Sequence, residues 1–462
     1  MDNKGIQKIK ENKVEVLSFA LCIGFYMVFC FGFGVQLCAD SNSYINMTSA
    51  REPVYPLLLA FFRLVCGETY YLWGVIIFQN MLMAFAVWKL TMWFRKHFSL
   101  PPWMVFICLA FHFGVALLCQ FAAGRASIYP NSILTEGITL ALWLIFINLL
   151  LEALFSGKVK YVALALVLAA VMMDTRKQMA VTYIVLFFTL VLGWIKRNGY
   201  WKKIGLTVGM IVISIGLAIA GTRVYNLVLR GEFAQNTRDM NLVLTTTLYV
   251  ADPEDASLIE EDAVRVLFEE TMRILDEKEC NYRYAKPGWR NLEAHYGAHY
   301  DMITIDTTAN GFIDYAIERG FSPGLEAEQE ADRMSGVIVK SLLPDNIGTY
   351  LKVYLASMAN GLINTVAKRH TVLDWYALVA YALYVGLTVV SMLKKETRAA
   401  GLVALTVLCG ILVNVGVAAA LIFCQTRYMI YNMALFYMAL FLMGYENAKV
   451  LKKGKGKKEE TI

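Results

Sequence analysis

Acids and arginines stand at the edges of long apolar runs in this sequence, where charged side chains are least expected. The stretch CADSNSYINMTSAREPVYPLLLAFF, residues 38–62, places Asp40 directly after one apolar run and Arg51 and Glu52 shortly before the next. A carboxylate accepts the proton of a weak hydroxyl nucleophile, and the planar guanidinium of arginine binds two phosphate oxygens at once. These residue types therefore suit acid–base chemistry beside a phosphate group, provided that other elements bring them together.

The composition predicts which elements these are. Of the 462 residues, 58% are hydrophobic and 17% are charged, and the mean hydropathy is +0.51, whereas soluble domains have about 25% charged residues. Apolar runs long enough to cross a bilayer as helices occur near 16–39, 70–94, 101–123, 134–155, 178–195, 204–229, 372–393, 399–425 and 428–446, and a shorter run occupies 159–173. We therefore expect an all-α polytopic membrane protein with about ten transmembrane helices.

Lysine and arginine then orient these spans. Basic clusters alternate along the chain with connections that are poorer in positive charge, and the positive-inside rule places the basic clusters in the cytoplasm. Both termini are then cytoplasmic in a multi-pass protein of the cell membrane. The connections predicted to face outward are 39–69, 124–133, 174–177, 230–371 and 425–427.

The longest outward connection predicts a small, mainly helical outer domain. Within it, residues 253–279 and 324–343 have apolar residues at helical spacing, whereas 283–306 reads as a loop. Two segments, 53–65 and 346–366, are predicted to be helices lying along the membrane interface, the second of them before the eighth span. The expected division is 1–229 for an N-terminal transmembrane module, 230–371 for the outer insertion, 372–446 for the C-terminal spans and 447–462 for a basic cytoplasmic tail. The end of this tail, KKGKGKKEETI, is expected to be disordered.

Charged residues of both signs gather on the predicted outer side. The candidates for a site at that surface, with two tyrosines beside them, are Asp40, Tyr44, Arg51, Glu52, Arg63, Arg125, Tyr129, Glu136, Asp174, Arg176, Lys177 and Arg427. Each also has a simpler interpretation. Asp40 can merely open a loop, Arg51 and Glu52 can form a surface pair of little energetic value, and the charges of 174–177 can pair within a turn. Glu136 is harder to explain in this way, because it stands inside the start of an apolar helix.

Other chemistry-bearing patterns are weak. His295 and His299 are spaced as metal ligands on one helix face would be, but Gly297 lies between them and no third ligand has a suitable spacing, which favours a solvated loop. Nine cysteines stand mostly inside apolar runs, which favours free thiols over a disulfide framework. The chain has neither a Walker loop nor a dinucleotide-binding fingerprint, and we expect no nucleic-acid partner.

Several of these motifs, in their order along the chain, resemble a family. The early Asp40 of the first outer loop followed by REPVYPLLL is similar to the polytopic glycosyltransferases of the GT-C superfamily, such as the protein O-mannosyltransferases and the lipid A aminoarabinose transferases. YPNSILTEGITLALWLIF, MMDTRKQMAV and SLLPDNIGTYLKVYLA also resemble segments of those enzymes. The resemblance covers about the first two hundred residues well and the rest loosely.

The resemblance implies a function and a role for each candidate. A sugar would move from a polyprenyl-phosphate donor to a glycan, lipid or protein acceptor on the outer face of the membrane. Asp40 would be the general base and Glu136 a second acid that shapes the site. The implied donor-phosphate ligands are Arg125, Arg176, Lys177 and Arg427, and the implied substrate contacts are Tyr44, Arg51, Glu52, Tyr129 and Asp174. The first loop reads Asp-Ser-Asn where paired acids would favour a metal, so we expect an enzyme that needs no metal or other cofactor.

Two other functions stay open on the sequence. A polysaccharide polymerase or ligase would also combine many spans, a large outer loop and outer arginines, and it would use a diphosphate-linked oligosaccharide. A lipid or solute transporter would need ionisable residues or broken helices near the middle of the bilayer. The predicted spans have few charges at that depth, which favours transfer chemistry at the surface.

Overall fold

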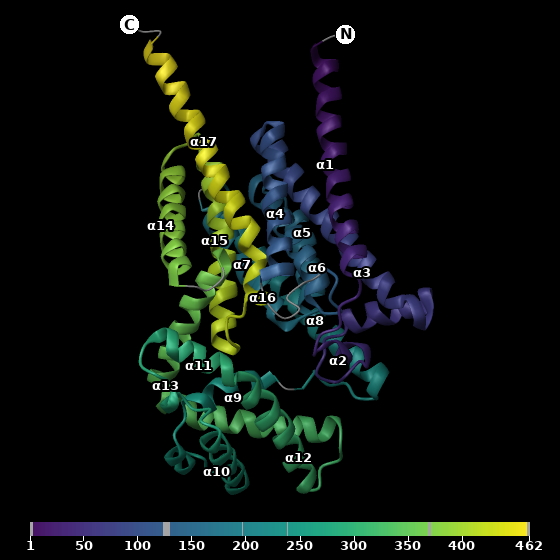
Figure 1. Cartoon of the computed structure of the whole chain (residues 1–462), viewed down its shortest axis with the longest axis vertical. Coiled ribbons are helices and arrows are strands. Elements are labelled where there is room, and N and C mark those ends of the chain that lie inside the picture. Colours follow the sequence, from purple (N-terminus) through teal and green to yellow (C-terminus); the bar gives the residue numbers. More distant parts are fainter. Residues whose placement is uncertain (1–2, 123–129, 196, 238, 368–370, 460–462) are drawn as a thin grey trace. The chain divides into compact units, whose positions relative to one another are not determined.

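The structure is a computed structural model that describes residues 3–122, 130–195, 197–237, 239–367 and 371–459 (Figure 1). Within these ranges the chain is helical and contains no named strand, although an isolated bridge pairs Gln36 with Ser132. Nine helices in the described residues are long and apolar enough to cross a membrane. The chain is therefore an all-α, multi-pass membrane protein.

The chain divides into two compact units. Unit 1 comprises Met1–Tyr225, Thr365–Val413 and Ile430–Ile462, and unit 2 comprises Asn226–Asn364 and Asn414–Met429. The sequence-based boundaries at 229 and 371 lie within a few residues of two of these limits. Asn414–Met429, which the sequence analysis assigned to the C-terminal spans, falls in unit 2 instead.

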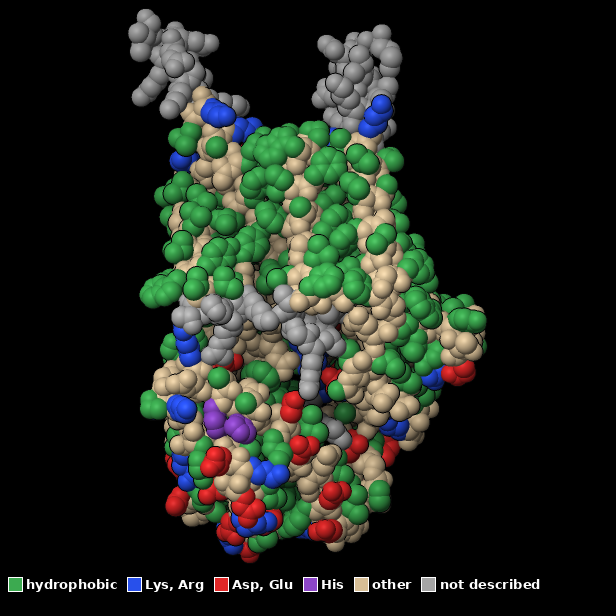
Figure 2. All heavy atoms as spheres, in the orientation of Figure 1, with side chains coloured by type: hydrophobic (Ala, Val, Ile, Leu, Met, Phe, Trp, Pro, Cys, Tyr) green, Lys and Arg blue, Asp and Glu red, His purple; other side chains and the backbone are tan. Residues whose placement is uncertain are grey.

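Unit 1 holds the long apolar helices. In chain order they are α1 (Asn3–Phe33), α2 (Ser41–Ile45), α3 (Val54–Phe98), α4 (Pro102–Ala122), α5 (Glu136–Ser156), α6 (Val159–Met173), η1 (Lys177–Ala180), α7 (Val181–Trp194), α8 (Tyr200–Arg230), α14 (Thr371–Leu393), α15 (Arg398–Leu421), η5 (Ile430–Asn432) and α17 (Met433–Glu459), with α8 and α15 continuing into unit 2. Helix α3 packs against α1 and α5, and α5 packs against α6. Hydrophobic side chains cover the flanks of unit 1, as a membrane-facing surface requires (Figure 2).

Helix α5 shows how local chemistry sets the ends of such a span. Glu136 occupies its first turn, where a carboxylate is favoured by the positive end of the helix dipole. The helix ends at Gly157, which adopts a left-handed conformation with φ of 67°, and glycine takes that conformation without steric penalty. Between these ends most of the side chains are buried, so α5 is a central helix of unit 1.

The segment after the first loop is helical as predicted and forms the first part of α3, whereas its place at the membrane interface stays a prediction. It begins at Val54 behind Pro53, whose fixed φ suits the start of a helix. A break at Gly67, with φ of 71°, separates it from the span that follows. The shorter run at 159–173, counted as a tenth span, is α6, which has 15 residues. This is fewer than the roughly 20 residues that a helix needs to cross a bilayer.

Unit 2 is a helical domain with its own core. Its elements are α9 (Asp239–Val250), η2 (Pro253–Leu258), α10 (Asp262–Glu277), η3 (Tyr282–Tyr284), α11 (Trp289–Asp301), η4 (Met302–Ala309), α12 (Asn310–Glu318), α13 (Leu325–Val366) and α16 (Thr426–Met429), with the end of α13 reaching unit 1. Leu248, Phe268, Tyr296 and Met334 are among its fully buried core residues. Unit 2 is therefore a helical unit with a buried core, and its assignment as the predicted outer domain stays a prediction.

Two local predictions were wrong, and two predicted helices are joined. The segment read as a loop contains α11 and the π-helical η4, because Gly297 lets α11 pack closely: a Cβ there would lie 3.2 Å from the Phe423 ring. The segments 324–343 and 346–366 are helical as predicted, but they form one 42-residue helix, α13, which Pro344 does not end. The tail predicted to be disordered is helical to Glu459, since α17 continues through it.

Candidate functional site

Backbone and amide hydrogen bonds tie the first loop of unit 1 to the loop before α5. The Gln36 amide donates to the carbonyl of Asn131, and the Ile133 amide donates to the carbonyl of Gln36, each at 3.0 Å. The side-chain amide of Asn131 donates to the Gly34 carbonyl at 3.0 Å and accepts from Asn80 at 2.8 Å. Two connections about a hundred residues apart in sequence are thus held at one level.

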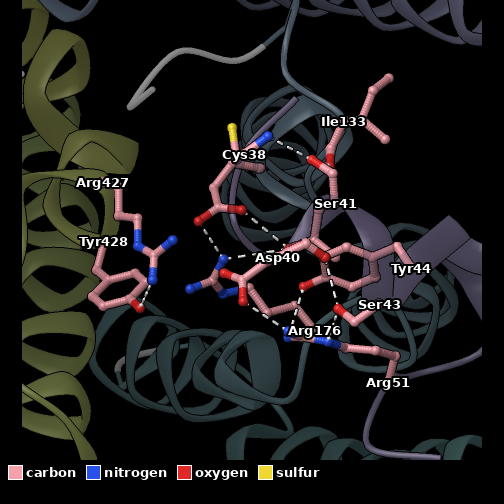
Figure 3. Close-up of polar contacts among 12 residues, drawn as sticks. Cys38, Asp40, Ser41, Ser43, Tyr44, Arg51, Ile133, Arg176, Arg427 and Tyr428 are labelled. Carbon is pink, nitrogen blue, oxygen red and sulfur yellow. Dashed lines mark hydrogen bonds and ion pairs between the residues drawn. The ribbon is translucent and has the colours of Figure 1, made fainter. Parts of the chain in front are cut away.

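Asp40 stands at the start of α2 and pairs with Arg51. The Arg51 Nη2 atom lies 2.8 Å from Asp40 Oδ1, its Nε donates to the Ser43 hydroxyl at 2.7 Å, and its guanidinium carbon lies 4.5 Å from the Tyr44 ring centroid. Figure 3 shows the side chains of Asp40, Ser43 and Tyr44 gathered around the Arg51 guanidinium. About a third of the Asp40 side chain, 37%, is exposed, so this carboxylate is both oriented by the arginine and accessible.

Glu136 forms a second pair, with Arg176, and this one is buried. Arg176 Nη1 lies 2.5 Å from Glu136 Oε1, and only 4% of the Glu136 side chain is exposed. Thr135 donates its hydroxyl hydrogen to Glu136 at 3.2 Å, while Arg176 Nε donates to the side chain of Gln178 at 3.0 Å. Because a buried carboxylate needs compensation, Glu136 fixes the position of the Arg176 guanidinium.

The turn after α6 brings Asp174 and Lys177 beside the segment that follows Arg51. The Val54 amide donates to the Asp174 carbonyl at 3.0 Å, and Lys177 Nζ lies 3.8 Å from Glu52 Oε1. The pKa of the Asp174 carboxyl is raised from 3.8 to about 7, mainly by burial. The Thr222 hydroxyl opposes this shift by donating to the carboxylate at 3.3 Å, and the charge of Glu52 adds to it. Asp174 is therefore a carboxyl that exchanges protons near neutral pH.

Tyr44 in the first loop lies near the charges of both the Asp40–Arg51 pair and the Glu136–Arg176 pair. The pKa of Tyr44 is raised to about 12, first by burial, while the charges of Arg51 and Arg176 lower it and those of Glu136 and Asp40 raise it. Four charges from three separate segments thus act on one hydroxyl. We call the set of residues that these segments contribute the loop cluster, and its members are Asp40, Tyr44, Arg51, Glu52, Glu136, Asp174, Arg176 and Lys177.

The remaining predicted site residues are not assigned to the loop cluster. Arg125 and Tyr129 are outside the described residues. Arg63, in the first part of α3, is half-buried and pairs at 3.2 Å with the exposed Glu68, which follows the break at Gly67. Arg427 belongs to unit 2, where its Nη2 donates to the Tyr428 hydroxyl at 2.7 Å and its guanidinium carbon lies 4.8 Å from that ring (Figure 3).

The sequence analysis missed several residues that position the cluster. Gln79 is fully buried in α3; it accepts from the Tyr55 hydroxyl at 2.9 Å and donates to the carbonyl of Pro130 at 2.6 Å. Gly137 leaves room for it, since a Cβ there would meet Gln79 at 2.4 Å. The signal was available: Gln79 and Asn80 are adjacent amides in an otherwise apolar run, and buried amides require partners.

An apolar groove lies beside the cluster within unit 1. It has a volume of about 360 Å³ and runs between α6 and α8, with Leu166, Ala170, Leu217 and Ala218 among its lining residues and Asp174 at its polar end. Its walls are formed mainly by the apolar side chains of membrane-spanning helices. The groove therefore suits a hydrocarbon chain whose polar end reaches Asp174.

Comparisons of the chain with protein-family models, with curated proteins and with solved structures each gave no match. Function is therefore inferred from the residues and their geometry. In the part of the chain that the structure describes, no group of three or more His, Cys, Asp or Glu side chains is arranged to hold a metal ion. His295 and His299 instead lie on α11, where His295 Nδ1 is 2.9 Å from the Tyr249 hydroxyl, and metal independence stays a prediction.

Proposed function

We propose that the chain is a membrane glycosyltransferase that moves a sugar from a polyprenyl-phosphate donor to an acceptor at the predicted outer face of the membrane. The observation that carries this proposal is the loop cluster itself. It gathers carboxylates and cations from three connections of a membrane protein, next to a groove that suits a lipid chain. These are the groups that transfer from a lipid phosphate requires.

In the proposed reaction, Asp40 takes the proton of the acceptor hydroxyl as the acceptor oxygen bonds to the anomeric carbon of the sugar. The bond between that carbon and the phosphate oxygen breaks, and polyprenyl phosphate leaves. Asp40 suits the base because its side chain is accessible and is held by Arg51. A positioned base of this kind contributes about 10² to 10⁴ in rate.

Arg176 and Lys177 are the proposed partners of the leaving phosphate. Fixed cations stabilise the charge that develops on a leaving group, and a guanidinium does so with two parallel hydrogen bonds. Arg176 is held by the buried Glu136, so its orientation is set before the donor binds. We therefore propose that Glu136 acts through Arg176, as a positioning residue.

Asp174 offers a link between the cluster and the donor's lipid. Because it lines the polar end of the apolar groove, a polyprenyl chain in the groove would present its phosphate near the turn that carries Arg176 and Lys177. The raised pKa of Asp174 favours the neutral carboxyl at acidic pH, which removes a negative charge from the neighbourhood of that phosphate.

The decisive experiment is a donor turnover assay with the purified protein in lipid vesicles. Polyprenyl-phosphate hexoses and pentoses are added with membrane extract as the source of acceptor, and free polyprenyl phosphate is measured by mass spectrometry. We expect release with one of these donors. Release only from diphosphate-linked oligosaccharides would instead support the polymerase or ligase, and movement of intact donor across the bilayer would support a transporter.

A further inference from the structure

A second cavity lies in unit 1, between α1 and the last turns of α3. It has a volume of about 750 Å³ and is lined by Glu15 of α1, by the last turns of α3 and by Glu152 of α5. Pockets of about 300 to 1,000 Å³ hold small molecules. By the positive-inside rule this end of the helices is cytoplasmic, so the cavity is distinct from the loop cluster and faces the other side of the membrane.

An apolar groove continues from this cavity along the helices. The groove has a volume of about 450 Å³, is lined by Val16, Phe19 and Phe85, and shares Glu15 and Trp88 with the polar cavity. Trp88 joins the two spaces: its ring lies 5.1 Å from that of Phe19, and its Nε1 donates to the Glu15 carbonyl at 3.3 Å. Tryptophan prefers the boundary between hydrocarbon and head groups. The polar cavity and the apolar groove that meet at Trp88 therefore match the head group and an acyl chain of a membrane lipid.

The polar cavity carries both signs of charge. Lys89, Arg95 and Lys96 line it together with Glu15 and Glu152. Among the described residues, no ion pair joins Lys89 or Lys96 to either of these acids, although all four line the same space. A ligand with a negative and a positive group therefore matches the cavity better than an ion of one sign does.

We propose that this cavity binds one phospholipid of the ethanolamine class. Its phosphate would lie against Lys89, Arg95 and Lys96, its ammonium group against Glu15 and Glu152, and one acyl chain in the groove beneath Trp88. Basic pockets between membrane helices on the cytoplasmic side bind lipid phosphates, and the two acids add a preference for the amine. This site does not depend on the proposed glycosyl transfer.

The test is native mass spectrometry of the whole chain, purified in mild detergent and titrated with phosphatidylethanolamine or phosphatidylglycerol of the same acyl chains. We expect one tightly bound phosphatidylethanolamine, with a Kd at least tenfold lower than that for phosphatidylglycerol, since each charge-assisted contact contributes about a tenfold change or more. Equal affinity for the two lipids, or no retained lipid, would overturn the proposal.

Two double variants locate the site and assign its charges. Lys89→Ala with Lys96→Ala removes the phosphate contacts and should weaken phosphatidylethanolamine binding about tenfold or more. Glu15→Gln with Glu152→Gln should reverse or abolish the preference over phosphatidylglycerol. Both lysines and Glu15 are exposed, so the fold should survive, and unchanged unfolding midpoints verify this.

The matched control is Lys158→Ala with Lys160→Ala, two exposed lysines that do not line the cavity. Lys158 lies in the predicted cytoplasmic connection between α5 and α6, and Lys160 lies in the first turn of α6. The control should bind phosphatidylethanolamine as the parent does. Loss of binding in the control as large as in the Lys89 and Lys96 variant would show that general surface charge holds the lipid. That result would overturn the assigned site, as would an acid variant that keeps the parental lipid preference.

Discussion

The ion pairs of the loop cluster and those of α10 in unit 2 use the same residue types in opposite settings. In α10, Arg265 pairs with Asp262, and Arg273 pairs with Glu270 and Glu277. These partners are three or four residues apart on one helix face, and their side chains are largely exposed. In the loop cluster, Arg176 reaches Glu136 across 40 residues of sequence, and the carboxylate is buried.

The difference concerns what each pair does. Exposed pairs contribute about 0 to 1 kcal/mol, since water solvates both charges in either state, so the charges of α10 mainly keep the surface of unit 2 soluble. A buried pair requires the removal of both charges from water and is retained at functional sites more often than for stability. Position and burial, rather than residue type, separate the candidate site from a solvated helix face.

The largest expected effect is the loss of glycosyl transfer in the Asp40→Asn variant. Asparagine keeps the size of the side chain and can still accept from Arg51, but it cannot take up the acceptor's proton, so we expect turnover to fall by about 10² to 10⁴. Stability should change by about 1 kcal/mol or less, because the pair is partly exposed. Glu68→Gln, which also removes an acid paired with an arginine, is the control and should keep parental turnover. A well-folded Asp40→Asn protein with parental turnover would exclude Asp40 as the base.

Glu136→Gln tests the buried side of the comparison. Loss of one charge leaves Arg176 without its buried partner, which should destabilise unit 1 by about 3 to 5 kcal/mol, measured as a lowered unfolding midpoint. The double variant Glu136→Gln with Arg176→Met should recover part of that stability but not turnover. If Glu136→Gln alone proved as stable as the parent, the Glu136–Arg176 pair would contribute no more to stability than the exposed pairs of α10.

Arg427 tests a prediction that rests on the sequence alone. If it binds the donor phosphate, Arg427→Ala should weaken donor binding about tenfold or more, and Arg427→Lys should recover only part of it because the planar fork is lost. Binding is measured with a fluorescent polyprenyl-phosphate sugar. Parental affinity in both variants would limit Arg427 to its contacts with Tyr428 inside unit 2.

Asp174 predicts a pH dependence whose sign follows from its raised pKa. Between 3.8 and about 7 the folded protein holds a proton that the unfolded chain releases, so stability falls as pH rises through this window. The slope is below about 1.4 kcal/mol per pH unit, since the carboxyl is partly exposed and water screens it. Asp174→Asn should flatten the plot of unfolding midpoint against pH, and an unchanged slope in that variant would remove Asp174 as its source.

The smallest effect is expected from Arg273→Gln on α10. Its partners Glu270 and Glu277 are exposed, so both the unfolding midpoint and turnover should match those of the parent. A clear loss of turnover in this variant would show that exposed pairs of unit 2 matter as much as the loop cluster, and the comparison above would fail.

The sequence predicted some features well because they depend on local chemistry. Span positions follow from length and hydropathy, and the nine long apolar helices found in the described residues agree with them. The short helix start behind Pro53 also followed from local rules. The prediction failed for α11, because glycine by itself disfavours a helix. Gly297 instead allows α11 to pack closely against Phe423, a residue distant in sequence.

The amino-acid sequence by itself thus determined the membrane class, the approximate spans and the set of charged residues at their ends, since each depends on a few neighbouring side chains. Only the tertiary structure decided that Asp40 pairs with Arg51 and Glu136 with Arg176, that Asp174 is buried enough to titrate near neutral pH, and that Gln79 and Asn131 hold the loops together. These contacts join segments far apart in the chain, and their energies depend on burial, which no local pattern encodes.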